Sequence, residues 1–167
     1  MKEFLTSLEQ SGLGQWVRDA PTIWAFPTIL FLHTFGMAIV AGGSAMIDLI
    51  VLGFWPSSSI KPFARVFPVM WVAFGVNAVT GTMMLVADAT AKLTSLDFYI
   101  KMALVFLGFF LLLRIRRLIF DDPRIDQAPL SGNAKMLAWA SLACWFGAIT
   151  AGRLLAYVGP TAAKATQ

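Results

Sequence analysis

Two ionisable side chains, His33 and Asp48, interrupt an otherwise apolar run between residues 27 and 54. An imidazole can ligate a metal or make hydrogen bonds, and a carboxyl group can hold a proton or pair with a cation. If the run is a helix, five side chains fall within an arc of roughly 80°: His33, Met37, Ala41, Ser44 and Asp48. Ionisable groups are costly in hydrocarbon and usually line cavities or partners, so we predict that this stripe faces the interior of the protein.

A second polar position, Arg153, lies near the end of the last apolar run, and Tyr157 follows one helical turn later. In a four-helix bundle, His33 and Arg153 would lie roughly 7–9 Å below the same surface, because each stands five or six residues inside its run. His33 could then ligate a haem iron while Arg153 neutralises a propionate, with Met37 and Tyr157 beside them. The chain has one histidine, which excludes bis-histidine ligation within one chain.

Other ligands suit the same residues. His33 and Arg153 could hydrogen-bond the head of a quinone or a lipid phosphate. His33, Met37 and the Met83–Met84 pair could instead hold Cu(I), which prefers thioether and imidazole ligands. A fourth interpretation needs no cofactor at all, since a neighbouring hydroxyl or a backbone carbonyl can satisfy the histidine and the methionines can simply pack.

Asp48 lies one to two turns from the opposite edge of the membrane, where the second apolar run begins and the third ends. Arg65 and Arg114 stand at those two positions. We therefore predict a structural ion pair between Asp48 and one of these arginines, in preference to a proton-relay acid.

Motifs for hydrolytic or group-transfer chemistry are absent from the sequence: there is no nucleophile motif with a histidine base, no phosphate-binding glycine loop and no CxxC. The chain is therefore not expected to be catalytic by itself. Its net charge of +4 is carried mostly by Lys and Arg near helix ends, without a basic patch interleaved with aromatics. Nucleic acid is accordingly not an expected partner.

Composition predicts an integral membrane protein. Of 167 residues, 58% are apolar and 13% charged, against about 45–50% and about 25% in soluble domains. Four apolar runs, each long enough to cross a bilayer core of about 30 Å, predict an all-α four-helix bundle with spans at about 27–54, 63–87, 98–120 and 134–158. Residues 1–26 mix apolar and charged side chains, which predicts an interfacial amphipathic helix, and residues 159–167 form a short polar tail.

Lysine and arginine bias predicts the orientation. The loops 55–62 and 121–133 and the helix ends beside them collect the larger share, including the Arg114–Arg117 cluster. Because cytoplasmic loops are enriched in these residues, we predict that both loops are cytoplasmic, that both termini are periplasmic, and that the membrane is a bacterial inner membrane.

Three short stretches carry a family resemblance: LHTFGMA at 32–38, IDL at 47–49 and GRLLAY at 152–157. With them, residues 14–158 resemble an uncharacterised bacterial family of small four-helix inner-membrane proteins. The resemblance implies the four-helix fold and a joint importance of His33, Asp48 and Arg153, and it brings no assigned activity. More loosely, the chain resembles four-helix membrane cytochromes and copper-resistance membrane proteins.

Together these observations favour a non-catalytic membrane subunit or anchor of a redox assembly that holds a haem b or a quinone near the outer leaflet. Its expected partners are the lipid bilayer and other membrane or periplasmic redox subunits. One alternative is a homo-oligomeric transporter or channel with a polar path along the first helix. A purely structural membrane protein is another.

Overall fold

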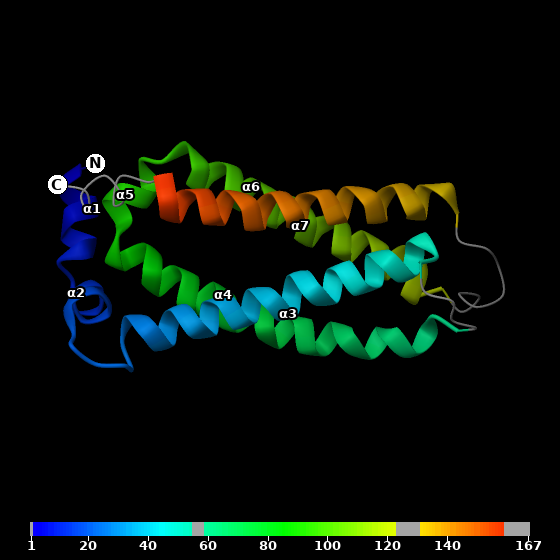
Figure 1. The fold of residues 1–167 in the computed structure, drawn as a ribbon, viewed down its shortest axis with the longest axis horizontal. Helices are drawn as coiled ribbons and strands as arrows, with labels where there is room; N and C mark the ends of the chain where they lie inside the picture. The colour runs from blue at the N-terminus through cyan, green and yellow to red at the C-terminus, as the bar shows by residue number, and fades with distance from the viewer. Residues whose placement is uncertain (1, 55–58, 123–130, 159–167) are drawn as a thin grey trace.

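Helices make up every element of the computed structural model, which describes residues 2–54, 59–122 and 131–158 apart from the side chains of residues 2 and 155–158. The predicted tail and parts of both predicted loops lie outside these residues. The order of elements, shown in Figure 1, is α1 (Lys2–Glu9), α2 (Gly12–Asp19), α3 (Phe26–Leu52), η1 (Lys61–Arg65), α4 (Val66–Ala87), α5 (Ala89–Leu93), α6 (Leu96–Ile115), η2 (Arg116–Phe120) and α7 (Gly132–Val158). η1 is a 3-10 helix and η2 is a π-helix.

Four helical stretches are long and apolar enough to cross a membrane: Phe26–Leu52, Lys61–Ala87, Leu96–Phe120 and Gly132–Leu154. At about 1.5 Å per residue, their 23–27 residues extend roughly 35–40 Å, which exceeds a hydrocarbon core of about 30 Å. Successive long helices run in opposite directions along the bundle (Figure 1). The prediction of an all-α chain with four helices long and apolar enough to span a membrane is thus confirmed for the described residues.

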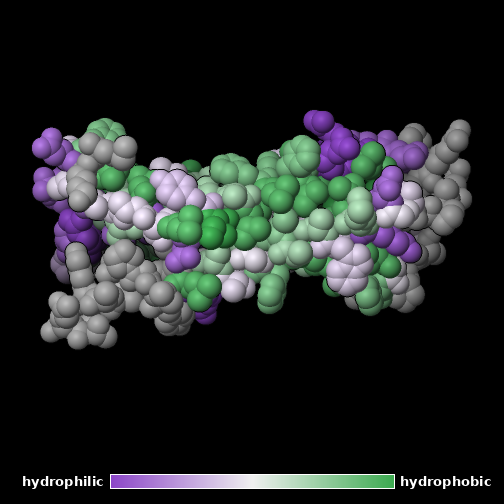
Figure 2. Space-filling model, turned by 90° about the horizontal axis from the view of Figure 1, so that it is seen from above, coloured by the Kyte–Doolittle hydropathy of each residue, from purple (hydrophilic) through white to green (hydrophobic). Residues whose placement is uncertain are grey.

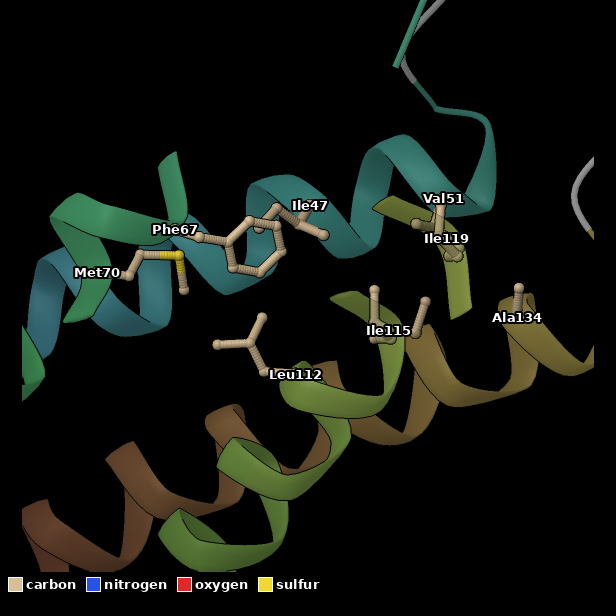
Figure 3. Packing of buried hydrophobic residues seen from close by; sticks show 9 residues of the cluster. Ile47, Val51, Phe67, Met70, Leu112, Ile115, Ile119 and Ala134 are labelled. Atoms are coloured by element: carbon tan, nitrogen blue, oxygen red, sulfur yellow. The ribbon is translucent and has the colours of Figure 1, made fainter. Parts of the chain in front are cut away.

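The largest apolar cluster lies in the half of the bundle away from the start of α3. It joins α3, α4, α6, η2 and α7 through nine buried side chains (Figure 3): Ile47, Val51, Phe67, Met70, Leu112, Ile115, Ile119, Ala134 and Ala138. The Phe67 ring meets the Phe120 ring edge to face at 5.1 Å, and the Arg116 guanidinium lies 5.4 Å from the Phe67 ring centre. This half of the bundle is therefore held by interlocked side chains from all four long helices.

In the middle of the bundle, Trp145 of α7 packs with Val40 and Ala41 of α3 and Ala73 of α4. The backbones of α3 and α4 come close at Gly36, where an added Cβ would lie 3.0 Å from the Ala73 carbonyl oxygen. Small residues permit such close approach between membrane helices. α3 and α4 are consequently in close contact at Gly36, one turn after His33, so this side of α3 faces α4.

The N-terminal helices α1 and α2 lie at the end of the bundle beside α5 (Figure 1). Ser11 separates the two helices, and its hydroxyl accepts a hydrogen bond from the Gly14 N–H at 3.2 Å, which caps α2. Val17 of α2 is fully buried in a cluster with residues of α3 and α4. The Glu9 carboxylate accepts a 2.6 Å hydrogen bond from the Thr90 N–H. The segment that the sequence predicts as one amphipathic helix is therefore two short helices attached to the bundle.

Hydrophobic side chains cover the middle of the face shown in Figure 2, and hydrophilic side chains gather toward its two ends. Large apolar residues stand exposed on each long helix, among them Phe31, Val72, Phe106 and Phe146. An apolar girdle between two polar ends is the surface expected of a protein whose helices meet acyl chains.

Candidate cofactor site beside His33

The His33 side chain is directed toward α4. Its Nδ1 lies 3.1 Å from the backbone carbonyl oxygen of Asn77 and 3.2 Å from the Thr80 hydroxyl oxygen. The carbonyl can only accept, and the Thr80 hydroxyl donates to the Val76 carbonyl at 2.7 Å, so Nδ1 carries the ring hydrogen. In the neutral ring the lone pair then resides on Nε2, which has no hydrogen-bond partner among the described residues.

Two further features hold the imidazole ring. The Asn77 side-chain amide donates a 2.8 Å hydrogen bond to the His33 backbone carbonyl, so the two residues exchange hydrogen bonds between α3 and α4. At Gly81, an added Cβ would lie only 3.0 Å from His33 Cε1, and glycine therefore leaves the space that the ring occupies. A histidine whose first nitrogen donates to a backbone carbonyl has the arrangement of most metal-ligating histidines, because that bond fixes the tautomer and the ring orientation.

Two cavities meet at His33. The first, of about 410 Å³, lies between α3, α4, α6 and α7, and its walls are mainly apolar: Val40, Phe74, Phe98, Met102, Val105, Phe106 and Trp145. The second, of about 760 Å³, extends to α2 and α5. Five side chains border both cavities: His33, Met37, Met84, Lys92 and Lys101. The imidazole thus stands between an apolar space and a larger, more polar one.

The larger cavity is rich in positive charge. Four cationic side chains from four different helices line it: Arg18 of α2, Lys92 of α5, Lys101 of α6 and Arg153 of α7. Asp88 contributes the one carboxylate among the residues that line this cavity. Before any ligand is considered, the described wall therefore carries more positive than negative charge.

Two of these cations already have partners. The Arg18 guanidinium donates to both carboxylate oxygens of Asp19, at 3.0 and 3.1 Å, and these hydrogen bonds to Asp19 raise the pKa of Arg18. Arg18 also donates to the Ala87 carbonyl at 3.3 Å. The Lys92 ammonium donates to the Met84 carbonyl. Burial lowers the pKa of Lys92, although the nearby Asp88 carboxylate opposes this effect.

The structure brings three of the predicted site residues, His33, Met37 and Arg153, to one cavity. Met83 and Met84 both pack against the buried cluster of Val17, Ile29 and Ala87, and Met84 also borders both cavities. The side chain of Tyr157 lies outside the described residues. No group of three His, Cys, Asp or Glu side chains in the described part of the chain is placed to hold a metal ion.

Three contributors were not among the residues that the sequence singled out. The Asn77 backbone carbonyl that fixes His33 leaves no trace in a residue pattern, because every residue has one. Lys92 and Lys101 did leave a signal: each is a half-buried lysine within one turn of an apolar run. Lysines in such positions either extend to the headgroups or line a polar cavity, and here both line cavities.

Asp48 differs from the prediction. It is fully buried, and its Oδ2 lies 3.5 Å from the Ser44 hydroxyl, which lies 3.3 Å from the hydroxyl of Ser141 on α7. Its Oδ1 has no partner among the described residues. The predicted ion pair with Arg65 or Arg114 is not formed, and both arginines are exposed. Exposed guanidinium groups keep their hydration, which a buried ion pair would remove.

Searches of protein-family models, curated proteins and solved structures find no match for this chain.

Proposed function

We propose that this chain is a multi-pass membrane subunit, or anchor, of a redox assembly and that it holds a haem-type cofactor or a quinone beside His33. The observation that carries the proposal is the hydrogen bonding of the His33 imidazole. Its Nδ1–H is committed to the Asn77 carbonyl, and its other nitrogen belongs to a ring that borders two cavities. That leaves one lone pair available to a ligand.

The residues present fit such a group. His33 would supply a nitrogen ligand to an iron, and Gly81 leaves the imidazole its space. The apolar cavity offers the kind of wall that a macrocycle or a quinone ring needs. A haem would contribute one-electron transfer, and the protein would contribute binding, orientation and a low-dielectric environment.

The proposed setting is a bacterial inner membrane. Lys61, Arg65, Arg114, Arg117 and Lys135 are exposed at the end of the bundle opposite His33, which supports a cytoplasmic location for that end and a periplasmic location for the cofactor. At the His33 end, Trp16 and Trp24 are 42% and 68% exposed, which supports an interfacial position for the N-terminal helices.

A channel or transporter with a polar path along α3 is less well supported. His33 bonds to α4, whereas Ser44 and Asp48 face α7. Between these positions α3 contributes Val40 and Ala41 to an apolar cluster. A continuous polar path would have to cross that cluster, so the geometry supports a ligand-holding role instead.

The test is optical absorption of the purified membrane protein, as isolated and after addition of haem b, with quinone content measured in a solvent extract. We expect either a haem spectrum or retained quinone, and we expect His33→Ala to lose it while still inserting and purifying. Thr150→Ala is the matched control, because this hydroxyl is exposed on α7 and bonds only to Phe146 among the described residues. A protein that binds neither ligand, or whose bound ligand is unaffected by His33→Ala, would overturn the proposal.

A further inference from the structure

The four cationic side chains that line the cavity of about 760 Å³ differ in whether they have a partner among the described residues. Arg18 and Lys92 are bonded to Asp19 and to the Met84 carbonyl, as described above. Lys101 and Arg153, in contrast, have no hydrogen bond or ion pair with any described residue. Lys101 is half-buried and Arg153 is exposed. A half-buried ammonium group without a counter-ion is costly, and a bound anion relieves that cost.

Lys101 and Arg153 converge on one place although they lie on different helices. The Lys101 side chain crosses to α7 at Gly152, where Cε and Nζ lie 3.5 and 3.6 Å from the position that an added Cβ would take. Arg153 is the next residue along α7 and lines the same cavity. The missing side chain at Gly152 thus leaves room for the Lys101 ammonium against α7, and one cation from α6 and one from α7 line the same cavity.

Lys101 also borders the apolar cavity, together with Phe98 and Phe106 of its own helix and Phe74 of α4. The site therefore combines an apolar space, a histidine with an available nitrogen and a cationic region that begins where the apolar walls end. A quinone matches the first two features and has no group for the third. An apolar ring system that carries an anionic substituent matches all three.

We infer that the ligand held beside His33 carries carboxylate groups, as a porphyrin does and a quinone does not, and that Lys101 and Arg153 bind these carboxylates from α6 and α7. This inference rests on the proposed function and narrows its ligand to the carboxylate-bearing class. The surroundings of Lys92 are consistent with it: burial lowers the pKa of Lys92, the Asp88 carboxylate raises it and the Lys101 charge lowers it, so a bound anion would act in the same direction as Asp88.

The experiment titrates the purified protein in detergent with three probes: haem b, its dimethyl ester, which lacks the carboxylates, and iron-free protoporphyrin, followed by its fluorescence. We expect the ester to bind at least about tenfold more weakly than haem b, since a charge-assisted hydrogen bond is then lost. Lys101→Met and Arg153→Met should each lower haem affinity by about tenfold and leave the affinity for the ester unchanged. Lys135→Met, an exposed cation at the opposite end, is the control.

Variants with defined roles separate this inference from the function on which it rests. His33→Ala should abolish the iron–imidazole spectrum yet retain protoporphyrin binding, since the carboxylates remain held. Lys101→Arg should restore much of the loss seen in Lys101→Met, which excludes a folding defect as its cause. Equal affinity for haem b and its ester would overturn the inference and leave the haem site standing. Retained quinone without porphyrin binding would overturn it as well, and a protein that binds neither ligand class would remove the proposed function itself.

Discussion

The two ends of the polar stripe on α3 share a helix and a face, and yet they are built in different ways. His33, near the start of α3, is hydrogen-bonded to α4 and opens onto two cavities. Asp48, four turns later, is fully buried among apolar residues and hydrogen-bonds to the side chains of Ser44 and Ser141. Two polar groups inside one helical bundle are therefore placed differently: His33 borders open space, and Asp48 is enclosed by packed side chains.

The surrounding packing explains the difference. Around Asp48, α3, α4, α6 and α7 interlock through the nine-residue cluster of Figure 3. Around His33, α4 and α6 are separated by the apolar cavity, and the N-terminal helices line the larger one instead of filling it. Open space beside an oriented titratable side chain is characteristic of ligand sites, whereas a close-packed acid more often serves structure. The following substitutions test that distinction.

The largest expected effect comes from removing a packed side chain. Ile47 is fully buried in the cluster of Figure 3, so Ile47→Ala should lower the free energy of unfolding by about 2–5 kcal/mol. Met37 lies ten residues earlier and borders both cavities, so Met37→Ala should cost only about 1 kcal/mol, since little packing is lost. Equilibrium unfolding in mixed detergent measures both values. Equal costs would mean that the two halves are packed alike.

A smaller effect is expected at the contact between α3 and α4. Asn77→Ala removes the 2.8 Å hydrogen bond from the side-chain amide to the His33 carbonyl and should cost about 1 kcal/mol of unfolding free energy. The backbone carbonyl that fixes His33 Nδ1 remains, so the absorption spectrum of a bound haem should be preserved. A lost spectrum in a folded Asn77→Ala protein would show that the side chain, and not the backbone, orients the imidazole.

The smallest effect is expected at Asp48. Because its carboxyl group contacts serines and not an arginine, the nearly isosteric Asp48→Asn should change the free energy of unfolding by about 1 kcal/mol or less. Breaking a buried ion pair by removing one partner typically costs about 3–5 kcal/mol. The same unfolding assay separates the two cases, and Asp121→Asn, an exposed acid at the same end, supplies the baseline.

The fold could be predicted from the sequence because the membrane leaves few options. Four long apolar runs separated by polar turns can satisfy their backbone groups in a bilayer only as helices, and those four helices are present. The N-terminal segment was harder to predict. The break between its two helices at Ser11 follows from a local helix cap. Its attachment to the bundle through Glu9, Val17 and Arg18 depends on tertiary contacts, which leave no periodic pattern in the sequence.

The candidate site could be predicted only in part, for a related reason. Helical spacing indicates which face a side chain occupies but not which neighbour it meets. It therefore predicts that His33 and Asp48 share one face of the helix. It does not predict that His33 contacts α4 while the Asp48 end of the stripe contacts α7. Proximity to a membrane edge does not establish proximity to an arginine, and the described contacts of Asp48 are with serines instead. Ser44, one turn before Asp48, was the better signal, since a hydroxyl at that spacing can reach the carboxyl group.

The walls of the larger cavity come from six helices, and Arg153 and Gly152 belong to the last of them. During synthesis the earlier helices enter the bilayer before α7 exists, and at that stage the space beside His33 has no far wall. A ligand that needs Arg153 could accordingly be held in full only once α7 is in place, so the proposed cofactor site would be completed by the last of the helices that line it.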